Sequence, residues 1–405
     1  MKKRRFISKG HLIDSGILAQ ILNLIVEEGA DYEIIEFRIG KTNAKESLLE
    51  IDLICESDDK LQGLSARLVH IGCYEKQTPE AVFKASTADK CVPEDFYSTT
   101  NHRTEVFYAG KWHSVKHQRM DAVIVAGDEY PECRKLRDVK KGDRVLCSTE
   151  SVRVFPPARE RESDDFGFMS GDVSSERSAD FTVEKIAAEL IKMKENREKV
   201  VVVAGPVVVH SGGGKALAAL IREGFIGGLL AGNAIAVHDM ESVFFGTSLG
   251  VCQKSGKPAY EGHKNHMRTI NRINHCGSIK NAVDQKVLES GIMYEVIKSG
   301  IPYCLAGSIR DDGPLPETVT DMIKAQGEYA EIIKDTSMVL MLSTMLHSIG
   351  TGNMMPSWVK TICIDINPAV VTKLADRGSG QAIGIVSDVG LFLRAVAARC
   401  IGDYK

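Results

Sequence analysis

The sequence predicts an α/β protein whose C-terminal half is a doubly wound parallel sheet, and two observations lead to this prediction. Four consecutive Val residues stand between Lys199 and Ala204, which is typical of a strand buried on both faces. From Phe181 onward, short apolar runs also alternate with longer segments of helical periodicity. Strands that alternate with helices form a parallel sheet covered on both faces, and its ligands bind at the carboxyl ends of the strands.

Composition narrows the class of protein further. The chain has 405 residues, of which 43% are apolar, and its formal net charge is −3. This balance excludes a disordered chain, and the lack of a basic excess argues against a nucleic-acid partner. No apolar run has the length of a signal peptide or a membrane span, so we expect a cytoplasmic protein without membrane contact. The 10 Cys show no C-x-x-C motif, which predicts reduced thiols rather than a zinc ribbon.

Residues 1–103 are predicted to form a ferredoxin-like α+β domain with the order β-α-β-β-α. Asp14 and either Asp58 or Asp59 precede segments with helical apolar spacing, and Gly29 and Gly72 end them. Such domains often bind small molecules or oligomerise, and we expect a homo-oligomer. The expected elements are a strand over 5–13, a helix over 14–28, strands over 32–39 and 47–55, and a helix ending near 72.

The remaining chain divides into three predicted segments. Residues 104–157 are expected to be a small β-rich element, because Gly110-Lys111 separates two short strands and Pro156-Pro157 follows the last one. Residues 158–180 are charged, which favours a linker over a mobile loop. Residues 181–405 are the α/β domain. Its expected strands are 199–204, 228–230, 234–237, 303–306, 338–342, 361–366 and 382–386, with helices over 183–195, 215–223, 283–299, 319–333 and 368–376.

A Gly-rich segment follows the four-Val strand and is the first candidate for a phosphate site. Consecutive Gly residues let backbone N–H groups approach a phosphate, and the helix that follows adds a favourable partial charge. The segment matches neither the Walker A motif nor G-x-G-x-x-G, and an ordinary Gly-rich turn is the alternative. The predicted contacts are Gly205, Ser211, Gly212, Gly213 and Gly214.

Two further segments stand where later strands are expected to end. One contains Gly350, Thr351, Gly352 and Asn353. In the other, Asp365 and Asn367 come at the end of an apolar strand, where a carboxylate commonly holds a ribose diol. Asn367 is equally suited to cap the helix that begins at Pro368. Taken together, the three segments predict a dinucleotide site.

Several polar groups could carry chemistry between these segments. His238, Asp239 and Glu241 follow the expected strand 234–237 and suit acid/base work or ammonium binding, although Asp239 could instead cap a helix. Next comes a group that could in principle hold zinc: His263, His266, His275 and Cys276. Because Lys264, Arg268 and Arg272 would repel a cation, we predict no metal there and favour a basic edge that attracts carboxylate or phosphate.

A substrate carboxylate needs a cation, and two positions are candidates. Arg310 follows another expected strand, beside Asp311 and Asp312, although a solvated surface turn is nearly as good an interpretation. In the N-terminal half, polar residues gather beside expected strands and could form the substrate side of a site or merely satisfy turns. These residues are Asn101, His102, Arg119 and Asp121.

The chain resembles archaeal-type ornithine cyclodeaminases over essentially its whole length. The N-terminal half carries this resemblance at Ile71-Gly72-Cys73, at 93–102 and at 118–121, which are similar to the N-terminal domain associated with lysine-oxoglutarate reductase/saccharopine dehydrogenase proteins. The C-terminal half carries it at 205–207, 232–234, 237–239 and 308–316. Similar sequences form the C-terminal half of cyanobacterial arginine dihydrolase/ornithine cyclodeaminase proteins. No dihydrolase domain precedes this chain, so arginine activity is not expected.

The resemblance implies an amino-acid substrate and the cofactor NAD. It implies that L-ornithine loses ammonia and closes to L-proline, while NAD takes hydride from Cα and returns it. It also implies a C-terminal fold of the deoxyhypusine-synthase/sirtuin type, in which Asn233 joins the cofactor contacts named above. The predicted catalytic residues are Asp239, His238 and Asp121, and the predicted substrate contacts are Asn101, His102, Arg119 and Arg310.

Two rival functions remain open on the sequence. One is a net NAD-dependent dehydrogenase of the amino-acid or saccharopine type, which would release NADH steadily. The other is an amino-acid-sensing protein with NAD as a structural ligand, which ligands would stabilise without turnover. The sequence does not decide between ornithine and a longer diamino acid, because one methylene changes binding by only about 1–3 kcal/mol.

Overall fold

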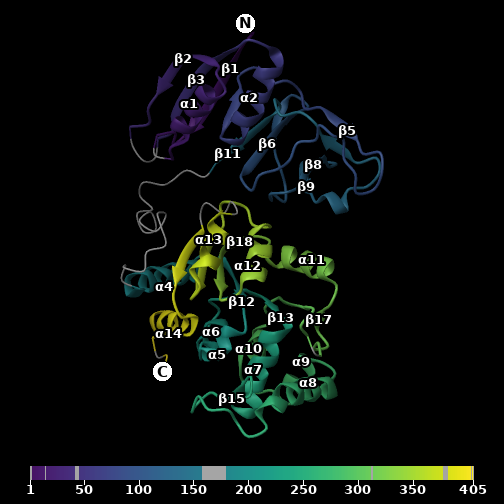
Figure 1. Ribbon diagram of the computed structural model, residues 1–405, viewed down its shortest axis with the longest axis vertical. Coiled ribbons are helices and arrows are strands. Elements are labelled where there is room, and N and C mark those ends of the chain that lie inside the picture. Colours follow the sequence, from purple (N-terminus) through teal and green to yellow (C-terminus); the bar gives the residue numbers. More distant parts are fainter. Residues whose placement is uncertain are drawn as a thin grey trace. The chain divides into compact units, whose positions relative to one another are not determined.

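The computed structural model describes residues 2–13, 15–41, 45–156, 179–311, 313–376, 382–402 and 404. The chain divides into two compact units (Figure 1). Unit 1 comprises Met1–Phe168 and Asn353–Trp358, and unit 2 comprises Met169–Gly352 and Val359–Lys405. The predicted linker at 158–180 falls almost wholly outside the described residues. No helix among the described residues combines the length and apolar character needed to cross a membrane.

Unit 1 begins with the predicted ferredoxin-like fold. Its antiparallel sheet has the strand order β2-β3-β1-β4, and two helices complete the β-α-β-β-α-β pattern. Ser57, rather than Asp58 or Asp59, caps the second helix by accepting the Lys60 N–H, and Asp14 lies outside the described residues. The elements are β1 (Lys2–Gly10), α1 (Ile17–Glu27), β2 (Asp31–Arg38), β3 (Ser47–Cys55), α2 (Asp58–His70) and β4 (Cys73–Glu75).

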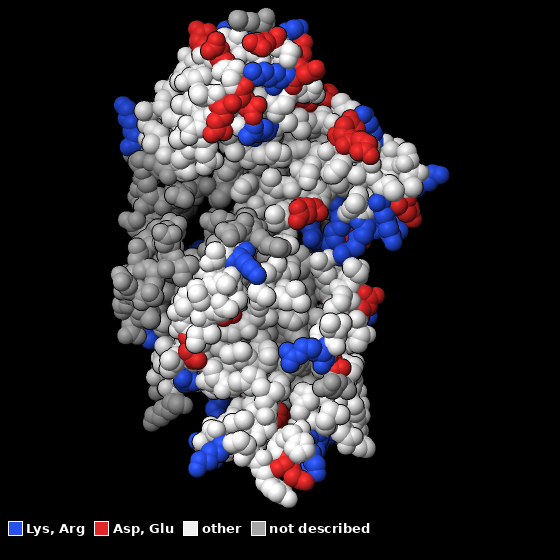
Figure 2. Space-filling view, viewed as in Figure 1, with Lys and Arg blue, Asp and Glu red and all other residues white. Residues whose placement is uncertain are grey.

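The two faces of this sheet differ in chemistry because side chains alternate along a strand. Phe6 of β1 and Leu53 of β3 are fully buried under the helices. On the other face, Arg5 contacts Asp52 at 2.7 Å, and this hydrogen bond lowers the pKa of Asp52 to about 2 despite its burial. Acidic and basic side chains are interleaved on the part of unit 1 that Figure 2 displays.

The rest of unit 1 is the predicted β-rich element, built from two small sheets. One has the order β5-β10-β8-β9 and the other β11-β6-β7. Because β5 pairs with β10, the element recruits chain from well before residue 104. The strands are β5 (Phe83–Ala85), β6 (Arg103–Tyr108), β7 (Lys111–Ser114), β8 (Val123–Ala126), β9 (Pro131–Arg134), β10 (Arg144–Leu146) and β11 (Val152–Phe155).

Unit 2 contains the predicted parallel sheet, with seven strands in the order β17-β16-β13-β12-β18-β19-β20. The chain starts at the central strand β12 and moves outward to β17, then returns to β18 on the other side of β12. The switch point, where ligands bind in such sheets, therefore lies between β12 and β18. The strands are β12 (Lys199–Ala204), β13 (Gly228–Gly232), β16 (Tyr303–Ala306), β17 (Thr318–Val319), β18 (Thr336–Leu342), β19 (Lys360–Asp365) and β20 (Ala382–Val386).

Helices cover both faces of this sheet (Figure 1). One group packs together around α6 and α14, and another joins α11, α12 and α13. The first group comprises α4 (Ala179–Glu195), α6 (Gly214–Arg222), α7 (Asn233–Phe245), α10 (Ile292–Ser299) and α14 (Val389–Cys400); the second comprises α11 (Met322–Ile332), α12 (Met345–Gly352) and α13 (Pro368–Asp376). Further elements are α5 (Val207–His210), β14 (Thr247–Ser248), β15 (Val251–Cys252), α8 (Asn265–Cys276) and α9 (Ile279–Asp284).

Two element predictions were wrong. The expected strand 234–237 is the first half of α7, which is buried on nearly every side and so lacks an amphipathic period. The expected helix 283–299 is the end of α9 and a separate helix, α10, with Gly291 at its N-cap at φ 103°. The deduction that His238 and Asp239 follow a strand therefore fails.

Strand β18, next to the central strand β12, should contribute strongly to the stability of unit 2. Leu340 is 1% exposed in this strand, whereas Leu391 of α14 is 61% exposed. We expect Leu340→Ala to lower the free energy of unfolding by about 2–5 kcal/mol, because it removes buried methyl groups and leaves a cavity. The matched control Leu391→Ala should change it by less than about 0.5 kcal/mol. Urea unfolding of both variants measures the difference, and equal losses would contradict the assigned burial.

Candidate cofactor and substrate sites

At the switch point the backbones of β12 and β18 come very close together. The Gly205 N–H donates to the Leu342 carbonyl at 2.9 Å. A Cβ atom at Gly205 would lie 2.2 Å from the Ser343 carbonyl oxygen, so only Gly fits there. Ser343 has φ 48°, and α12 begins two residues later. This strand-to-helix turn presents the N-terminus of α12 at the carboxyl edge, where an anionic group is favoured.

Asp365 stands at the end of β19, on the same edge, and is 8% exposed. Its Oδ1 accepts the Asn367 N–H at 2.8 Å. The Asn367 Oδ1 accepts the Ala369 N–H at 3.0 Å, so Asn367 does cap α13, as the alternative interpretation proposed. The second carboxylate oxygen of Asp365 makes no hydrogen bond to a side chain that the structure describes.

His347 is a group at this edge that the sequence prediction did not select. The Tyr329 hydroxyl donates to the Ala231 carbonyl at 2.8 Å and lies 3.0 Å from His347 Nδ1. Because that hydroxyl has one proton, Nδ1 must carry the hydrogen of the second bond, which leaves His347 Nε2 as an acceptor. A Cβ at Gly232 would lie 3.0 Å from Nε2. Burial lowers the pKa of His347, so the imidazole is neutral at pH 7.

The loop after β16 contains the predicted clamp Arg310, which is exposed. Asp311 organises the loop by accepting the Ser308 N–H at 2.8 Å, and Asp312 lies outside the described residues. Asn233 anchors the chain beyond it, because its Oδ1 accepts the Leu315 N–H at 3.0 Å and the Thr318 hydroxyl at 2.8 Å. Asn233 therefore shapes this edge through its side chain.

The Gly-rich segment after α5 packs against a helix of its own unit. A Cβ at Gly213 would lie 3.0 Å from Leu393 Cδ1 and 3.1 Å from Gly390 Cα, both in α14. The Ser211 carbonyl accepts the Arg394 guanidinium at 3.1 Å. Of the first predicted segment, Gly205 lies at the strand end, whereas Ser211, Gly212 and Gly213 contact α14 and Gly214 begins α6.

The second predicted segment is also placed differently from the expectation. Gly350, Thr351 and Gly352 form the last turn of α12 rather than a loop at the strand end, and Asn353 belongs to unit 1. The residues that follow β18 directly are Ser343 and Thr344. The Ser-Thr pair after an apolar strand was the sequence signal that could have identified them.

Asp239 is buried in α7 and holds the start of α10. Its two carboxylate oxygens accept the Ile292 and Met293 N–H groups, both at 2.9 Å. Burial raises the pKa of Asp239 to about 6, although these two hydrogen bonds oppose the rise. The sequence alternative that Asp239 caps a helix is thus what the structure contains, except that the helix is α10.

His238 and Glu241 are one helical turn apart on α7, with His238 Nδ1 3.1 Å from Glu241 Oε2. Burial acts to raise the pKa of Glu241, but hydrogen bonds from His238, Gly250 and Thr247 lower it overall. The rings of His210 and His266 lie on either side of His238, with centroid distances of 4.8 and 5.1 Å. His275 and Cys276, which the sequence grouped with His266, are not part of this cluster.

Unit 1 contains a second group of polar side chains that surrounds Arg119. Burial lowers the pKa of Arg119, and no Asp or Glu among the described residues forms an ion pair with it. Five buried atoms there have no hydrogen-bond partner within the described chain: His70 Nδ1, Tyr97 Oη, His102 Nδ1, Gln118 Oε1 and Arg119 Nε. Buried polar atoms are normally satisfied, so this set indicates a ligand with its own polar groups.

These orphaned atoms belong to one neighbourhood. The rings of His70 and Tyr97 stack at 5.6 Å, and His70 adds to the lowering of the pKa of His102. Cys133 influences the pKa of both Tyr97 and Arg119. Asn101 is buried beside His102, whereas Asp121 is exposed at φ 55°. The sequence selected Asn101, His102 and Arg119 as substrate contacts, which stays a prediction, and it did not select His70 and Tyr97.

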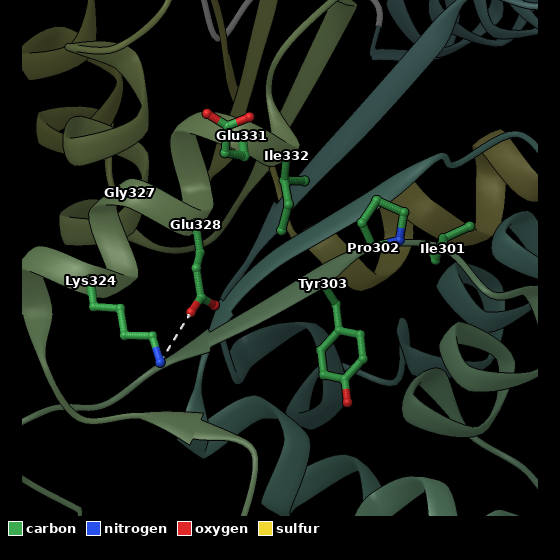
Figure 3. A pocket seen from close by; sticks show the side chains of 8 residues that line it. All are labelled: Ile301, Pro302, Tyr303, Lys324, Gly327, Glu328, Glu331 and Ile332. Carbon is green, nitrogen blue, oxygen red and sulfur yellow. Dashed lines mark ion pairs between the residues drawn. The ribbon is translucent and has the colours of Figure 1, made fainter.

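The hollow shown in Figure 3 is not part of either group. It has a volume of about 710 Å³ and is lined by the start of β16, the two residues before it and one side of α11. Lys324 and Glu328 face each other there at 4.0 Å. Because it lies at the amino end of β16, it is at the opposite edge from the switch point.

Three family models match consecutive parts of the chain. They are described as the LOR/SDH bifunctional enzyme conserved region (residues 4–102), the first C-terminal region of arginine dihydrolase ArgZ-like proteins (103–183) and their C-terminal Rossmann fold (184–396). An ornithine cyclodeaminase of Methanocaldococcus jannaschii is 49% identical over 401 residues, which are 97% of this chain and 95% of that protein. The chain belongs to the ornithine cyclodeaminase family.

Other members of the family extend the comparison to solved structures. The bifunctional arginine dihydrolase/ornithine cyclodeaminase AgrE of Nostoc sp. is 45% identical over 95% of this chain, which spans 56% of AgrE. Crystalline ArgZ matches 98% of this chain with a TM-score of 0.83 and 40% identity, and this chain spans 58% of it. AgrE in ternary complex with ornithine and NAD⁺ matches 98% of this chain with a TM-score of 0.54 and 42% identity.

The buried carboxyl group of Asp239 predicts a pH-dependent stability. Its folded pKa of about 6 lies above the ordinary 3.8, so the folded state binds the extra proton and gains stability at low pH. This gain is complete below about pH 4 and is lost as the pH rises through 6. Relative to Asp239→Asn, the wild-type free energy of unfolding should fall by about 2–3 kcal/mol between pH 4 and 7.

Chemical denaturation at several pH values measures this difference. Asp388→Asn, at the exposed N-cap of α14, is the control for removing an acidic helix cap. A difference between the wild type and Asp239→Asn that stays constant with pH would contradict the assignment.

Proposed function

We propose that this protein is an NAD-dependent ornithine cyclodeaminase that converts L-ornithine to L-proline and ammonia. The observation that carries the proposal is similarity along nearly the whole chain to five archaeal proteins of that name, at 46–49% identity. The ternary complex of AgrE shows that a relative binds both ornithine and NAD⁺. The reaction is a lyase step that leaves substrate and product at the same net oxidation level.

The carboxyl edge of unit 2 is suited to NAD. At Gly205 and Gly232 a side chain would collide with Ser343 or His347, so these glycines let the chain segments of this edge pack closely. The N-terminus of α12 with Ser343 and Thr344 would hold phosphate, and Asp365 would hold a ribose diol. When bound, NAD supplies a reversible hydride acceptor. Gly213, Gly350 and the neighbouring predicted contacts stay candidates of lower rank for cofactor binding.

Arg119 supplies the cation that an amino-acid carboxylate requires. Its guanidinium is partly desolvated and free of an acidic partner in the described chain, so a carboxylate would add charge-assisted hydrogen bonds without displacing an internal ion pair. Tyr97 Oη and Gln118 Oε1 are available for the other polar atoms of the substrate. Arg310 is solvent-exposed in its loop and is the weaker of the two predicted clamps.

His347 is the best-placed proton acceptor at the carboxyl edge of unit 2. Tyr329 fixes the tautomer whose Nε2 is unprotonated, and burial keeps the ring neutral. Such an imidazole can accept a proton from an amine of the substrate. Asp239 then acts as a positioning residue for α10. His238, Asp239 and Asp121 stay candidates of lower rank for the catalytic role.

We infer that the protein works as a cytoplasmic homo-oligomer in proline formation and without a nucleic-acid partner. Strand β2 supports the oligomer, because it is an edge strand with exposed apolar residues. Tyr32, Ile34 and Ile35 are 39%, 44% and 41% exposed. An open apolar edge of this kind is normally covered in a stable protein.

The fate of the Cα hydrogen tests the proposed reaction. We expect ornithine deuterated at Cα to give proline that retains most of its deuterium, because the hydrogen leaves and returns within one turnover. NADH should not accumulate with product. Mass spectrometry of the proline and absorbance of the reduced cofactor provide the two readouts. Unlabelled proline, or NADH formed one-for-one with product, would favour a dehydrogenase and overturn the proposal.

The role of Arg119 is tested by Arg119→Gln. Loss of a charge-assisted hydrogen bond of about 1.5–3 kcal/mol should raise KM for ornithine roughly 10- to 150-fold, while NAD affinity stays unchanged. Arg137→Gln is the matched control, since Arg137 is a nearby cation that pairs with Asp138 instead. Equal KM values for the two variants would remove Arg119 from the substrate site.

A further inference from the structure

Glu241 is a buried carboxylate with an unusual set of partners. It is 0% exposed and accepts the Thr247 hydroxyl at 2.8 Å and the Gly250 N–H at 3.1 Å. No Lys or Arg among the described residues lies within ion-pair distance of it, and His238 is its one basic neighbour. An ionised carboxylate in the interior is costly unless a positive charge accompanies it.

The side chains around Glu241 are ligands that bind transition metals. His238 and Glu241 are three residues apart on α7, which places them on one face of the helix. His266, from the first turn of α8, completes a group whose ligand atoms all lie within 4.8 Å of one another. His210 packs against His238 from another side, and its Nδ1 is held by the Ser248 hydroxyl at 2.6 Å.

We propose that His238, Glu241 and His266 bind one divalent ion of the zinc type. Imidazole and carboxylate are the ligands that such an ion takes in proteins. Two ligands on one tetrahedral zinc ion lie roughly 3.3 Å apart, and His238 Nδ1 is 3.1 Å from Glu241 Oε2. The ion would supply a positive charge beside the buried Glu241 carboxylate.

Three basic residues, Lys264, Arg268 and Arg272, argued against a metal in the sequence, and each has a partner outside the cluster. Lys264 donates to Glu261 at 2.7 Å, and Arg268 lies 3.9 Å from the same carboxylate. Arg272 stacks over the ring of Phe244 at 4.5 Å. All three side chains are exposed, so solvent screens their charges. Their partners, Glu261 and Phe244, also lie outside the cluster. The sequence grouped His266 with His263, His275 and Cys276, whereas the structure places it beside His238 and Glu241.

Such an ion would join three segments of unit 2. Its ligands come from α7 and α8, and Glu241 is also bonded to the turn that follows β14 through the Leu249 and Gly250 N–H groups. The site lies along α7 rather than at the carboxyl edge, and it does not depend on the proposed ornithine reaction.

Cobalt(II) titration of the metal-free full-length protein tests the site. We expect one Co²⁺ per chain, the intense visible absorption of a tetrahedral ion without a thiolate charge-transfer band, and displacement by Zn²⁺. His266→Ala should weaken Co²⁺ binding by more than about 100-fold, because the loss of a ligand should exceed the 10- to 100-fold effect typical of an outer partner. The thermal midpoint should rise with Co²⁺ in the wild type and not in the variant.

The matched control is His275→Ala, an exposed His on the same helix, which should bind Co²⁺ like the wild type. His266 is only partly buried, so its variant remains informative if His238→Ala or Glu241→Gln fails to fold. Circular dichroism and retained NAD binding verify the fold. Absence of a bound ion, a thiolate band, or equal affinity in His266→Ala and His275→Ala would each overturn the proposal, and the cluster would then hold a proton in place of a metal.

Discussion

The close approach of β12 and β18 is the constraint on which the functional edge of unit 2 depends. The Gly205 N–H bonds to the end of β18, and the Ser343 carbonyl occupies the space where a side chain at 205 would begin. After β12 the chain continues toward β13, and after β18 it continues toward β19, so the switch point of the sheet lies between these two strands. The N-terminus of α12, Asp365 at the end of β19 and His347 beside Gly232 lie at this carboxyl edge.

Buried polar groups in this protein divide into those that are satisfied internally and those that are not. Asp239 and Asn233 have their oxygens occupied by backbone or hydroxyl donors, so they position helices and loops. The set around Arg119 has the opposite character, since five buried atoms there lack a partner in the described chain. For Asp239 and Asn233, internal hydrogen bonds indicate a structural role, whereas the unpartnered atoms around Arg119 are available to a ligand.

Internal packing also explains why the Gly-rich segments were poor guides to the position of a phosphate site. Three consecutive Gly residues suggested a phosphate cradle, yet Gly213 is small because α14 passes within contact distance. The Gly residues near 350 end α12, while the strand end itself is formed by Ser343 and Thr344. Glycine is required both for ligand approach and for close helix packing, and a local sequence does not distinguish these two demands.

The sequence by itself determined the fold class, the ferredoxin-like start of the chain and the family. Those conclusions rest on local signals: the four-Val strand, the alternation of strands with helices, and motifs that lie close together along the chain. It also selected Asp365 as a ribose contact and Arg119 as a substrate contact, and both roles stay predictions. Tertiary structure alone decided that 234–237 is helical, since α7 is buried on nearly all sides and no periodic pattern marks it. It also decided that Asp239 caps a helix 53 residues away and that His266 faces Glu241 rather than Cys276. Contacts of that kind join segments distant along the chain, and residue spacing carries no information about them until the packing of the helices is known.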